Sequence, residues 1–222
     1  FVDWGKYLEG KLSDAISTAV AMDRLKALAN TITTIPDEVK LHSRVAKVYD
    51  DRRKMAAGEQ PADWGFAENL AYATLLDEGY GMRLVGQDVG RGTFTHRHAI
   101  LHDQNTDAYY LPLRQLVDRP FKATVIDSLL SEEAVMAFEY GFSTTDPNTL
   151  CIWEGQFGDF ANGAQVVIDQ FIASGADMVV IHLESDTPEM IHRTLARIHE
   201  LGCKAGLTIK PEAVDPDDVE ML

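Results

Sequence analysis

Positive charge is scarce in this chain of 222 residues. It has 20 lysines and arginines against 35 aspartates and glutamates, a formal net charge of −15 at pH 7. Proteins bind nucleic-acid backbones by neutralising phosphates with Lys and Arg, and anionic membrane surfaces repel acidic proteins. Long apolar runs are missing too, since none reaches the ~20 residues of a membrane-spanning helix. We therefore expect neither nucleic acid nor membrane as a partner.

Cysteine is also rare. Cys151 and Cys203 lie in unrelated apolar contexts, so we expect two buried, reduced thiols rather than the disulfide of an oxidising compartment. No secretory signal is visible, and the chain begins with Phe1 rather than Met. These features favour a cytoplasmic protein and a sequence that is a fragment of a longer one.

What the chain has is an alternation of helical and strand patterns. Two charged, amphipathic helices are predicted first, over 22–35 and 39–58, and they form a leader without a catalytic grouping. After a Gly- and Pro-containing linker at 58–65, further helices are predicted at 66–79, 131–145, 161–175 and 187–202. Strands are predicted at 82–86, 121–127, 149–155, 177–184 and 204–210. Strands separated by helices of this length predict an α/β fold, with a mainly parallel sheet and helices on both faces.

The segment VIDSLLSEEAV places acidic residues where a strand passes into a helix. Ser131 is the expected N-cap, and Glu132 and Glu133 follow at the positive end of the helix. At the carboxyl edge of a parallel sheet, such a carboxylate can act on a ligand nitrogen or a water. Acidic first turns are common, however, so the residues alone favour the simpler interpretation of a well-formed helix start.

Two aromatic residues follow the next predicted strand, in the segment IWEGQFGDFANG. Phe157 and Phe160 flank Gly158-Asp159 at the carboxyl end of that strand. Their rings could stack on a planar ligand ring. The alternative is that both rings pack over the top of the core.

A Gly-punctuated segment over 86–104 is predicted to be a loop that leads into a helical turn. Its glycines do not match a phosphate-binding loop, which ends in Gly-Lys-Ser/Thr. Among its histidines, His98 and His102 would share a helix face, as metal ligands do. No cysteine or carboxylate cluster completes that set, so we expect no metal site. The preferred interpretation is a polar active-site loop that contains Asp88, His96 and His98.

Long stretches of this sequence resemble one enzyme family. The stretches are DRRKMAAGEQPADWGFAENLAYATLLDEG, VGQDVGRGTFTHRHAILHDQ, DSLLSEEAVMAFEYGFST and IWEGQFGDFANGAQVVIDQFI. From about residue 61 to 173 the chain resembles the pyrimidine-binding domain of the thiamine-diphosphate-dependent first component of the 2-oxoglutarate dehydrogenase complex. The leader from about residue 20 is similar to the same family.

The resemblance implies a function in oxidative decarboxylation of 2-oxoglutarate in the tricarboxylic acid cycle. It implies a homodimer, a lipoyl-bearing succinyltransferase as partner, and thiamine diphosphate bound between domains. By its position after the helix-capping serine, Glu132 corresponds to the family's glutamate that hydrogen-bonds the aminopyrimidine ring. Phe157 or Phe160 corresponds to the aromatic residue beside that ring. Magnesium would bind through a second domain, whose GDG and Asn signature this sequence does not contain. The resemblance therefore implies that this chain supplies only one half of the cofactor site.

After Gly175 the resemblance changes. GADMVVIHLESDTPEMIHRTLARIHELGCKAGLTIKPEAV is similar to one strand-helix-strand unit of ribulose-phosphate epimerases. His182 and Glu184 share a strand face there, and His182 corresponds to a pocket-lining position. The expected organisation is a helical leader over 1–60, a pyrimidine-binding domain over 61–173, and an epimerase-like extension over 174–222 that completes the same sheet.

Three functions follow from these resemblances. The first is an enzyme component that supplies the pyrimidine side of a shared site. The second is a folded chain that does no chemistry. We expect the chain alone to bind the cofactor weakly or not at all, because about half of the cofactor's contacts have no residues to make them. The third, epimerase activity, is rejected because two strands cannot close the barrel that such enzymes need.

Overall fold

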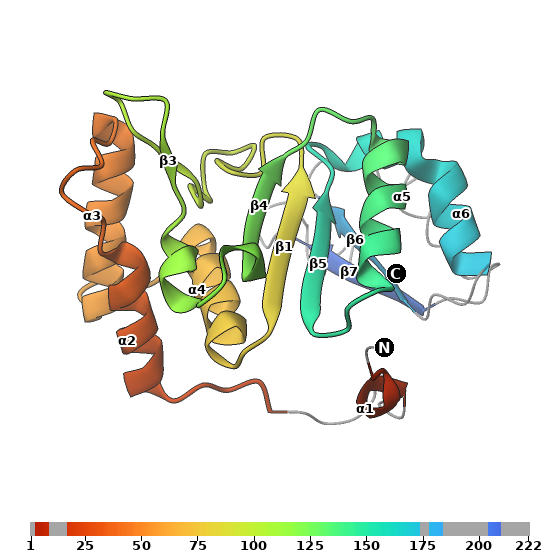
Figure 1. Ribbon diagram of the computed structural model, residues 1–222, viewed down its shortest axis with the longest axis horizontal. Coiled ribbons are helices and arrows are strands. Elements are labelled where there is room, and N and C mark those ends of the chain that lie inside the picture. The colour runs from red at the N-terminus through yellow and green to blue at the C-terminus, as the bar shows by residue number, and fades with distance from the viewer. Residues whose placement is uncertain (1–2, 9–16, 174–177, 184–203, 210–222) are drawn as a thin grey trace, which may run out of the picture. The chain divides into compact units, whose positions relative to one another are not determined.

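The computed structural model describes residues 3–8, 17–173, 178–183 and 204–209 (Figure 1). The chain divides into two compact units, and each is described by itself. The first unit contains residues 1–128 and 139–154, and the second contains 129–138 and 155–222. The boundary between them runs through one helix, α5 (Glu132–Ser143).

The first unit is built on a parallel sheet of three strands, β1 (Gly81–Gly86), β4 (Ala123–Asp127) and β5 (Thr149–Glu154). The strand order is β4-β1-β5, so β1 is central. All three strands run in the same direction, and the register pairs Gly86 with both Asp127 and Glu154. The three carboxyl ends therefore meet at one edge of the sheet, where ligands of open parallel sheets bind.

Helices cover both faces of this sheet, as predicted. Met82 and Leu84 are fully buried in the cluster that also contains Phe66 of α4 (Trp64–Asp77). The intervening Arg83 points to the opposite face, because side chains alternate along a strand. There its guanidinium binds the Glu139 carboxylate of α5 through two hydrogen bonds of 2.7 and 2.8 Å. The sheet is thus covered by α4 on one face and by the C-terminal half of α5 on the other.

The predicted leader helices are present and pack against the same core. They are α2 (Met22–Thr33) and α3 (Ser43–Ala57), which precede α4 and lie beside each other in Figure 1; α1 (Gly5–Leu8) comes before both. Gly58 ends α3 in the left-handed conformation, with φ of 81°, as its predicted stop role requires. The most buried residues of α3 are Tyr49, Arg52 and Ala56, whereas the apolar Val45, Val48 and Met55 are half-buried.

The second unit begins with the first turns of α5. The predicted cap is present, since Ser131 Oγ accepts a hydrogen bond from the Ala134 amide at 3.4 Å. A 3-10 helix, η3 (Gly158–Ala164), leads directly into α6 (Gln165–Ala173). Val135, Ala164 and Val167 are buried and belong to this unit.

Strands β6 (Met178–Leu183) and β7 (Lys204–Ile209) lie where the sequence predicts them and pair with each other in parallel. Among the strands that the structure describes, β6 is hydrogen-bonded to β7 alone. That these strands complete the sheet of β1 stays a prediction. Several predicted features lie outside the described residues: the helix at 187–202, the join at Ser174-Gly175, Glu184 and Cys203.

Two local predictions are wrong. The segment 98–102 is not a helical turn: its end forms the short strand β2 (Leu101–His102), paired antiparallel with β3 (Tyr109–Tyr110). Phe121 is not in a strand, because Pro120 begins the 3-10 turn η2 (Pro120–Lys122), which follows η1 (Pro112–Leu116). Proline favours the first position of a helical turn and cannot donate a ladder hydrogen bond.

Cys151 on β5 is a free thiol and half-buried, less enclosed than predicted. Burial, together with its hydrogen bond to Glu139, raises the pKa of Cys151 to about 12. It is therefore protonated and unreactive near neutral pH. Within the described part of the chain, no helix has the length and apolar character needed to cross a membrane.

Candidate functional site

In the first unit, polar groups gather at the carboxyl edge of the three-stranded sheet. Gly86 ends β1 so close to β5 that an added Cβ would lie 2.1 Å from the Glu154 carbonyl oxygen. Only glycine fits this approach. The loop 87–100 then turns back over the edge, and the Gly90 amide donates a hydrogen bond of 2.8 Å to Asp127 Oδ1. The loop is thereby tied to the end of β4.

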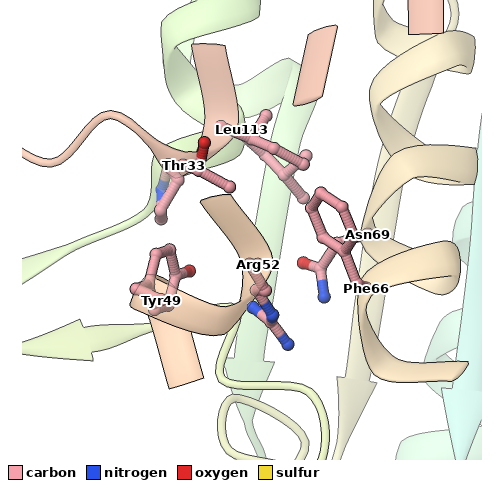
Figure 2. A pocket seen from close by; sticks show the side chains of 8 residues that line it. Thr33, Tyr49, Arg52, Phe66, Asn69 and Leu113 are labelled. Carbon is pink, nitrogen blue, oxygen red and sulfur yellow. The ribbon is translucent and has the colours of Figure 1, made fainter. Parts of the chain in front are cut away.

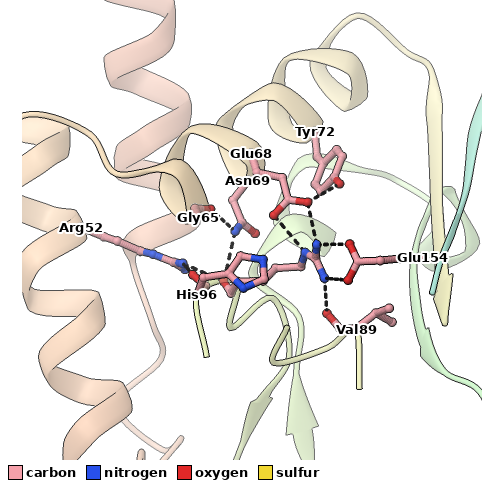
Figure 3. A network of polar contacts seen from close by, with 9 residues as sticks. Arg52, Gly65, Glu68, Asn69, Tyr72, Val89, His96 and Glu154 are labelled. Atoms are coloured by element: carbon pink, nitrogen blue, oxygen red, sulfur yellow. Dashed lines mark hydrogen bonds and ion pairs between the residues drawn. The ribbon is translucent and has the colours of Figure 1, made fainter. Parts of the chain in front are cut away.

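Arg97 ties the same loop to β5 and α4. Its guanidinium donates to both carboxylate oxygens of Glu68 on α4, at 2.9 Å each. It also donates to both oxygens of Glu154, at 2.9 and 2.5 Å, and to the Val89 carbonyl at 3.0 Å. Figure 3 shows the two carboxylates reaching the guanidinium from opposite sides. These five hydrogen bonds match the five N–H donors of an arginine.

This arginine is almost completely buried, with 2% of its surface exposed. Burial alone would lower its pKa, but the hydrogen bonds to Glu154 and Glu68 outweigh that effect and raise it. Tyr72 donates to Glu68 at 2.7 Å, and burial followed by the Glu68 charge raises the pKa of that tyrosine. The Arg97 guanidinium therefore stays charged between the side chains of Glu68 and Glu154.

Side chains from α3 and α4 reach the backbone of the loop. Arg52 Nη2 donates to the carbonyls of His96 and Arg97 at 3.0 and 2.7 Å. The Tyr49 hydroxyl donates to the His98 carbonyl at 2.9 Å, and Asn69 donates to the Arg97 carbonyl at 3.2 Å. The carbonyl groups of three successive loop residues are thus held by side chains of two helices.

The three loop residues singled out in the sequence have different surroundings. Asp88 forms an ion pair with Arg91 and has a positive φ of 59°. His96 is half-buried, and its ring lies against Gly92, where an added Cβ would approach Cε1 to 2.5 Å. His98 is also half-buried, and burial, with the Arg52 and Arg91 charges, lowers its pKa. His98 shares no helix with His102, which lies in β2.

A second set of polar and aromatic groups lies in the second unit. Glu132 is half-buried in the first turn of α5, and an added Cβ at Gly163 would lie 3.3 Å from its Oε2. The carboxylate therefore lies against η3. Phe157 and Phe160, at the start of η3, contact each other edge-to-face, with ring centroids 5.5 Å apart. They expose 43% and 39% of their surface, so they do not pack fully into a core.

A small cavity lies between α2, α3, α4 and η1 (Figure 2). Its volume is about 10 Å³, close to the minimum for one water molecule. It is too small for a substrate or cofactor. Within the described residues, no group of three or more His, Cys, Asp or Glu side chains is arranged to hold a metal ion.

Sequence reasoning missed Arg97, Glu68 and Arg52. Each lies in a charged helix or a polar loop, where solvent exposure is the usual expectation. The signal that could have identified Arg97 is its place between two histidines in a Gly-bounded loop. Its carboxylate partners are 29 and 57 residues away in the chain, so no local pattern identifies them.

Comparison with known families gives two matches. Residues 60–183 match the transketolase pyrimidine-binding domain. Residues 161–217 match the ribulose-phosphate 3-epimerase family. Both resemblances predicted from the sequence are confirmed. The two matches overlap over 161–183, which includes α6 and β6.

Several similar curated proteins carry the same name. The chain is 57% identical over 178 residues to the 2-oxoglutarate dehydrogenase E1 component of Cupriavidus necator, which covers 78% of this chain and 19% of that protein. It is 53% identical over 174 residues to the protein of that name from Haemophilus influenzae, with the same two coverages. The chain therefore spans about a fifth of the length of the curated relatives it matches.

Proposed function

This chain belongs to the transketolase pyrimidine-binding domain family, and on that basis we propose that it supplies the pyrimidine side of a thiamine diphosphate site. The enzyme would be a 2-oxoglutarate dehydrogenase first component, as its relatives are named. The observation that carries the proposal is the position of Glu132, a half-buried carboxylate in the first turn of α5 that lies against η3, the 3-10 helix whose start carries two exposed aromatic rings.

These residues fit the chemistry of an aminopyrimidine. A carboxylate accepts hydrogen bonds from protonated ring nitrogens, and partly exposed phenyl rings offer faces for stacking. In contrast, the five hydrogen bonds of Arg97, four to carboxylate oxygens and one to the Val89 carbonyl, leave that arginine no N–H with which to hold a diphosphate.

Thiamine diphosphate, when bound, supplies the electron sink for decarboxylation. In the proposed site Glu132 holds and moves a proton at the pyrimidine ring, while Phe157 and Phe160 orient that ring. The loop with Asp88, His96 and His98 lines the carboxyl edge of the sheet, where it provides polar groups towards the substrate. The diphosphate and magnesium are assigned to a second domain.

Three further parts of the proposal concern partners and location. Large apolar side chains are exposed around the start of α5, including Leu129, Leu130 and Phe138. Exposed apolar patches mark association surfaces, so we assign this one to a second copy of the chain. A lipoyl-bearing succinyltransferase would take the product of decarboxylation, and the enzyme would be cytoplasmic.

Reconstitution tests the proposal. The chain is mixed with a diphosphate- and magnesium-binding domain of a 2-oxoglutarate dehydrogenase first component, and carbon dioxide release from 2-oxoglutarate is measured with thiamine diphosphate and magnesium. We expect release from the mixture and none from either part alone, because each part holds half of the cofactor contacts. A mixture that binds the cofactor tightly but releases no carbon dioxide would favour the non-catalytic alternative instead.

A further inference from the structure

We propose that Tyr49 and Arg52 of α3 are positioning residues, which hold the backbone of residues 96–98 so that His96 and His98 are presented at the carboxyl edge of the sheet. The helix that the sequence indicates to be a plain leader would then be part of the site. This inference rests on the proposed role of the loop 87–100 in the active site, but its structural part is testable without that role.

The contacts converge on three consecutive carbonyl groups. One guanidinium nitrogen of Arg52 binds two of them, and the Tyr49 hydroxyl binds the third. Both side chains are buried, with 2% of their surface exposed. Arg52 also lies over the Tyr49 ring, with its guanidinium carbon 5.1 Å from the ring centroid. The two residues therefore form one unit, which we call the α3 clamp.

The buried charge of Arg52 is compensated by peptide carbonyls and an aromatic ring. No ion pair with a carboxylate is found for it among the described residues, whereas Arg97 binds two carboxylates. Burying an arginine is costly unless its charge is compensated. Here the compensation comes from two peptide carbonyls of the loop and from the Tyr49 ring, whose hydroxyl also binds the loop. A residue that served the packing of α3 alone would not need a charged group at this position.

The loop backbone is strained at three positions, one of which the clamp holds. Within the described residues, the positive-φ residues other than glycine are Asp88, Thr95 and His98, at 59°, 55° and 40°, and all three lie in this loop. Such conformations persist only where surrounding contacts impose them, and they cluster at functional sites. The Tyr49 hydrogen bond acts on the residue with φ of 40°, His98 itself.

The loop is also held at close range from α4. An added Cβ at Gly65 would lie 2.0 Å from the His96 carbonyl oxygen, the same oxygen that Arg52 binds. Arg97 is buried in its carboxylate cluster, and His96 and His98 on either side of it are half-buried. The α3 clamp thus determines which way the two imidazoles face.

Three variants test the clamp, with Lys54→Gln as the matched control. Lys54 is on the same helix but is exposed, and it pairs with an exposed Asp51. Tyr49→Phe removes one hydroxyl, and Arg52→Gln removes the positive charge. Arg52→Lys keeps the charge but lacks the planar guanidinium with its fixed N–H donors. Amide hydrogen exchange is followed at Gly92, Arg97 and Ala99, whose amides donate to carbonyls inside the loop.

We expect loop exchange to rise about 5-fold in Tyr49→Phe and at least about 10-fold in Arg52→Gln, the effects of losing a neutral and a charged hydrogen bond. Arg52→Lys should restore little of the protection, because an ammonium is a point charge. Exchange in β1 and in the control should not change. Equal acceleration in β1 and the loop, or no acceleration in the loop, would overturn the proposal. If Arg52→Gln does not fold, Tyr49→Phe alone decides.

Titration of His98 by NMR provides a second readout. The charged groups that act on its imidazole are Arg52, Arg91 and His96, and all three lower its pKa, in addition to burial. Arg52→Gln should therefore raise the His98 pKa, whereas Lys54→Gln should leave it unchanged. An unchanged His98 pKa in Arg52→Gln would contradict the clamp.

The same variants in the reconstituted enzyme separate this inference from the proposed function. Faster loop exchange together with lower kcat and unchanged cofactor affinity supports both. Faster loop exchange with unaltered turnover would leave the clamp in place and overturn the role of the loop in the active site.

Discussion

Glu132→Gln is expected to lower 2-oxoglutarate-dependent carbon dioxide release by the reconstituted enzyme about 10²–10⁴-fold, the usual contribution of a positioned proton-transfer group. Glutamine has the shape of glutamate and still occupies the space against Gly163. It cannot accept a proton, however. Affinity for thiamine diphosphate should fall much less than turnover, so kcat is the parameter to measure.

Glu133→Gln is the matched control for this experiment. Both residues lie in the first turn of α5, so both substitutions remove a similar favourable interaction with the helix dipole. Glu133 is exposed, whereas Glu132 is half-buried beside η3. Activity of Glu133→Gln should match the wild type. Equal losses in the two variants would mean that the effect comes from the helix start and not from the site.

Arg97→Leu is expected to lower the free energy of unfolding by about 3 kcal/mol, measured by urea denaturation. Removing one partner of a buried ion pair typically costs 3–5 kcal/mol, because the remaining charge loses its compensation. Glu68 and Glu154 are 25% and 31% exposed and recover some hydration, which sets the estimate at the lower end. Arg97→Lys should restore only part of the loss, since an ammonium cannot form two forked pairs.

Arg119→Leu is the control for charge removal. Arg119 lies 3.8 Å from Asp118, and both side chains are well exposed, so the pair should contribute less than about 1 kcal/mol. The double variant Arg97→Leu with Glu154→Gln should regain part of the stability lost in Arg97→Leu, because one uncompensated carboxylate is removed. If Arg97→Leu and Arg119→Leu were equally stable, the cluster would not hold the loop to the sheet.

Local patterns predict the elements of this fold well. Gly58 stops α3, Ser131 caps α5, and β4, β5, β6 and β7 lie within the predicted segments, while β1 begins one residue before its segment. These features depend on residues close together in sequence, where capping and side-chain periodicity act. The errors at Phe121 and at 98–102 arise where a proline or a tertiary contact overrides the periodicity.

The polar centre of the first unit could not be predicted in the same way. Arg52 lies in a helix rich in charges, and such helices are usually solvated on their polar face. Its burial depends on carbonyls 44 and 45 residues away. Glu132 illustrates the converse case. Its residue context indicates only a helix start, and the family resemblance is what assigns it a proton-transfer role.

We expect this chain to contact the pyrimidine side of the cofactor and not its diphosphate. Calorimetric titration of the reconstituted enzyme with thiamine diphosphate and, separately, with pyrophosphate tests it directly when the wild type is compared with the double variant Phe157→Ala, Phe160→Ala. We predict that affinity for thiamine diphosphate falls roughly 10-fold, since stacking on an aromatic pair contributes on the order of 1–2 kcal/mol, while affinity for pyrophosphate does not change. An equal loss for both ligands, or a loss for neither, would contradict the account.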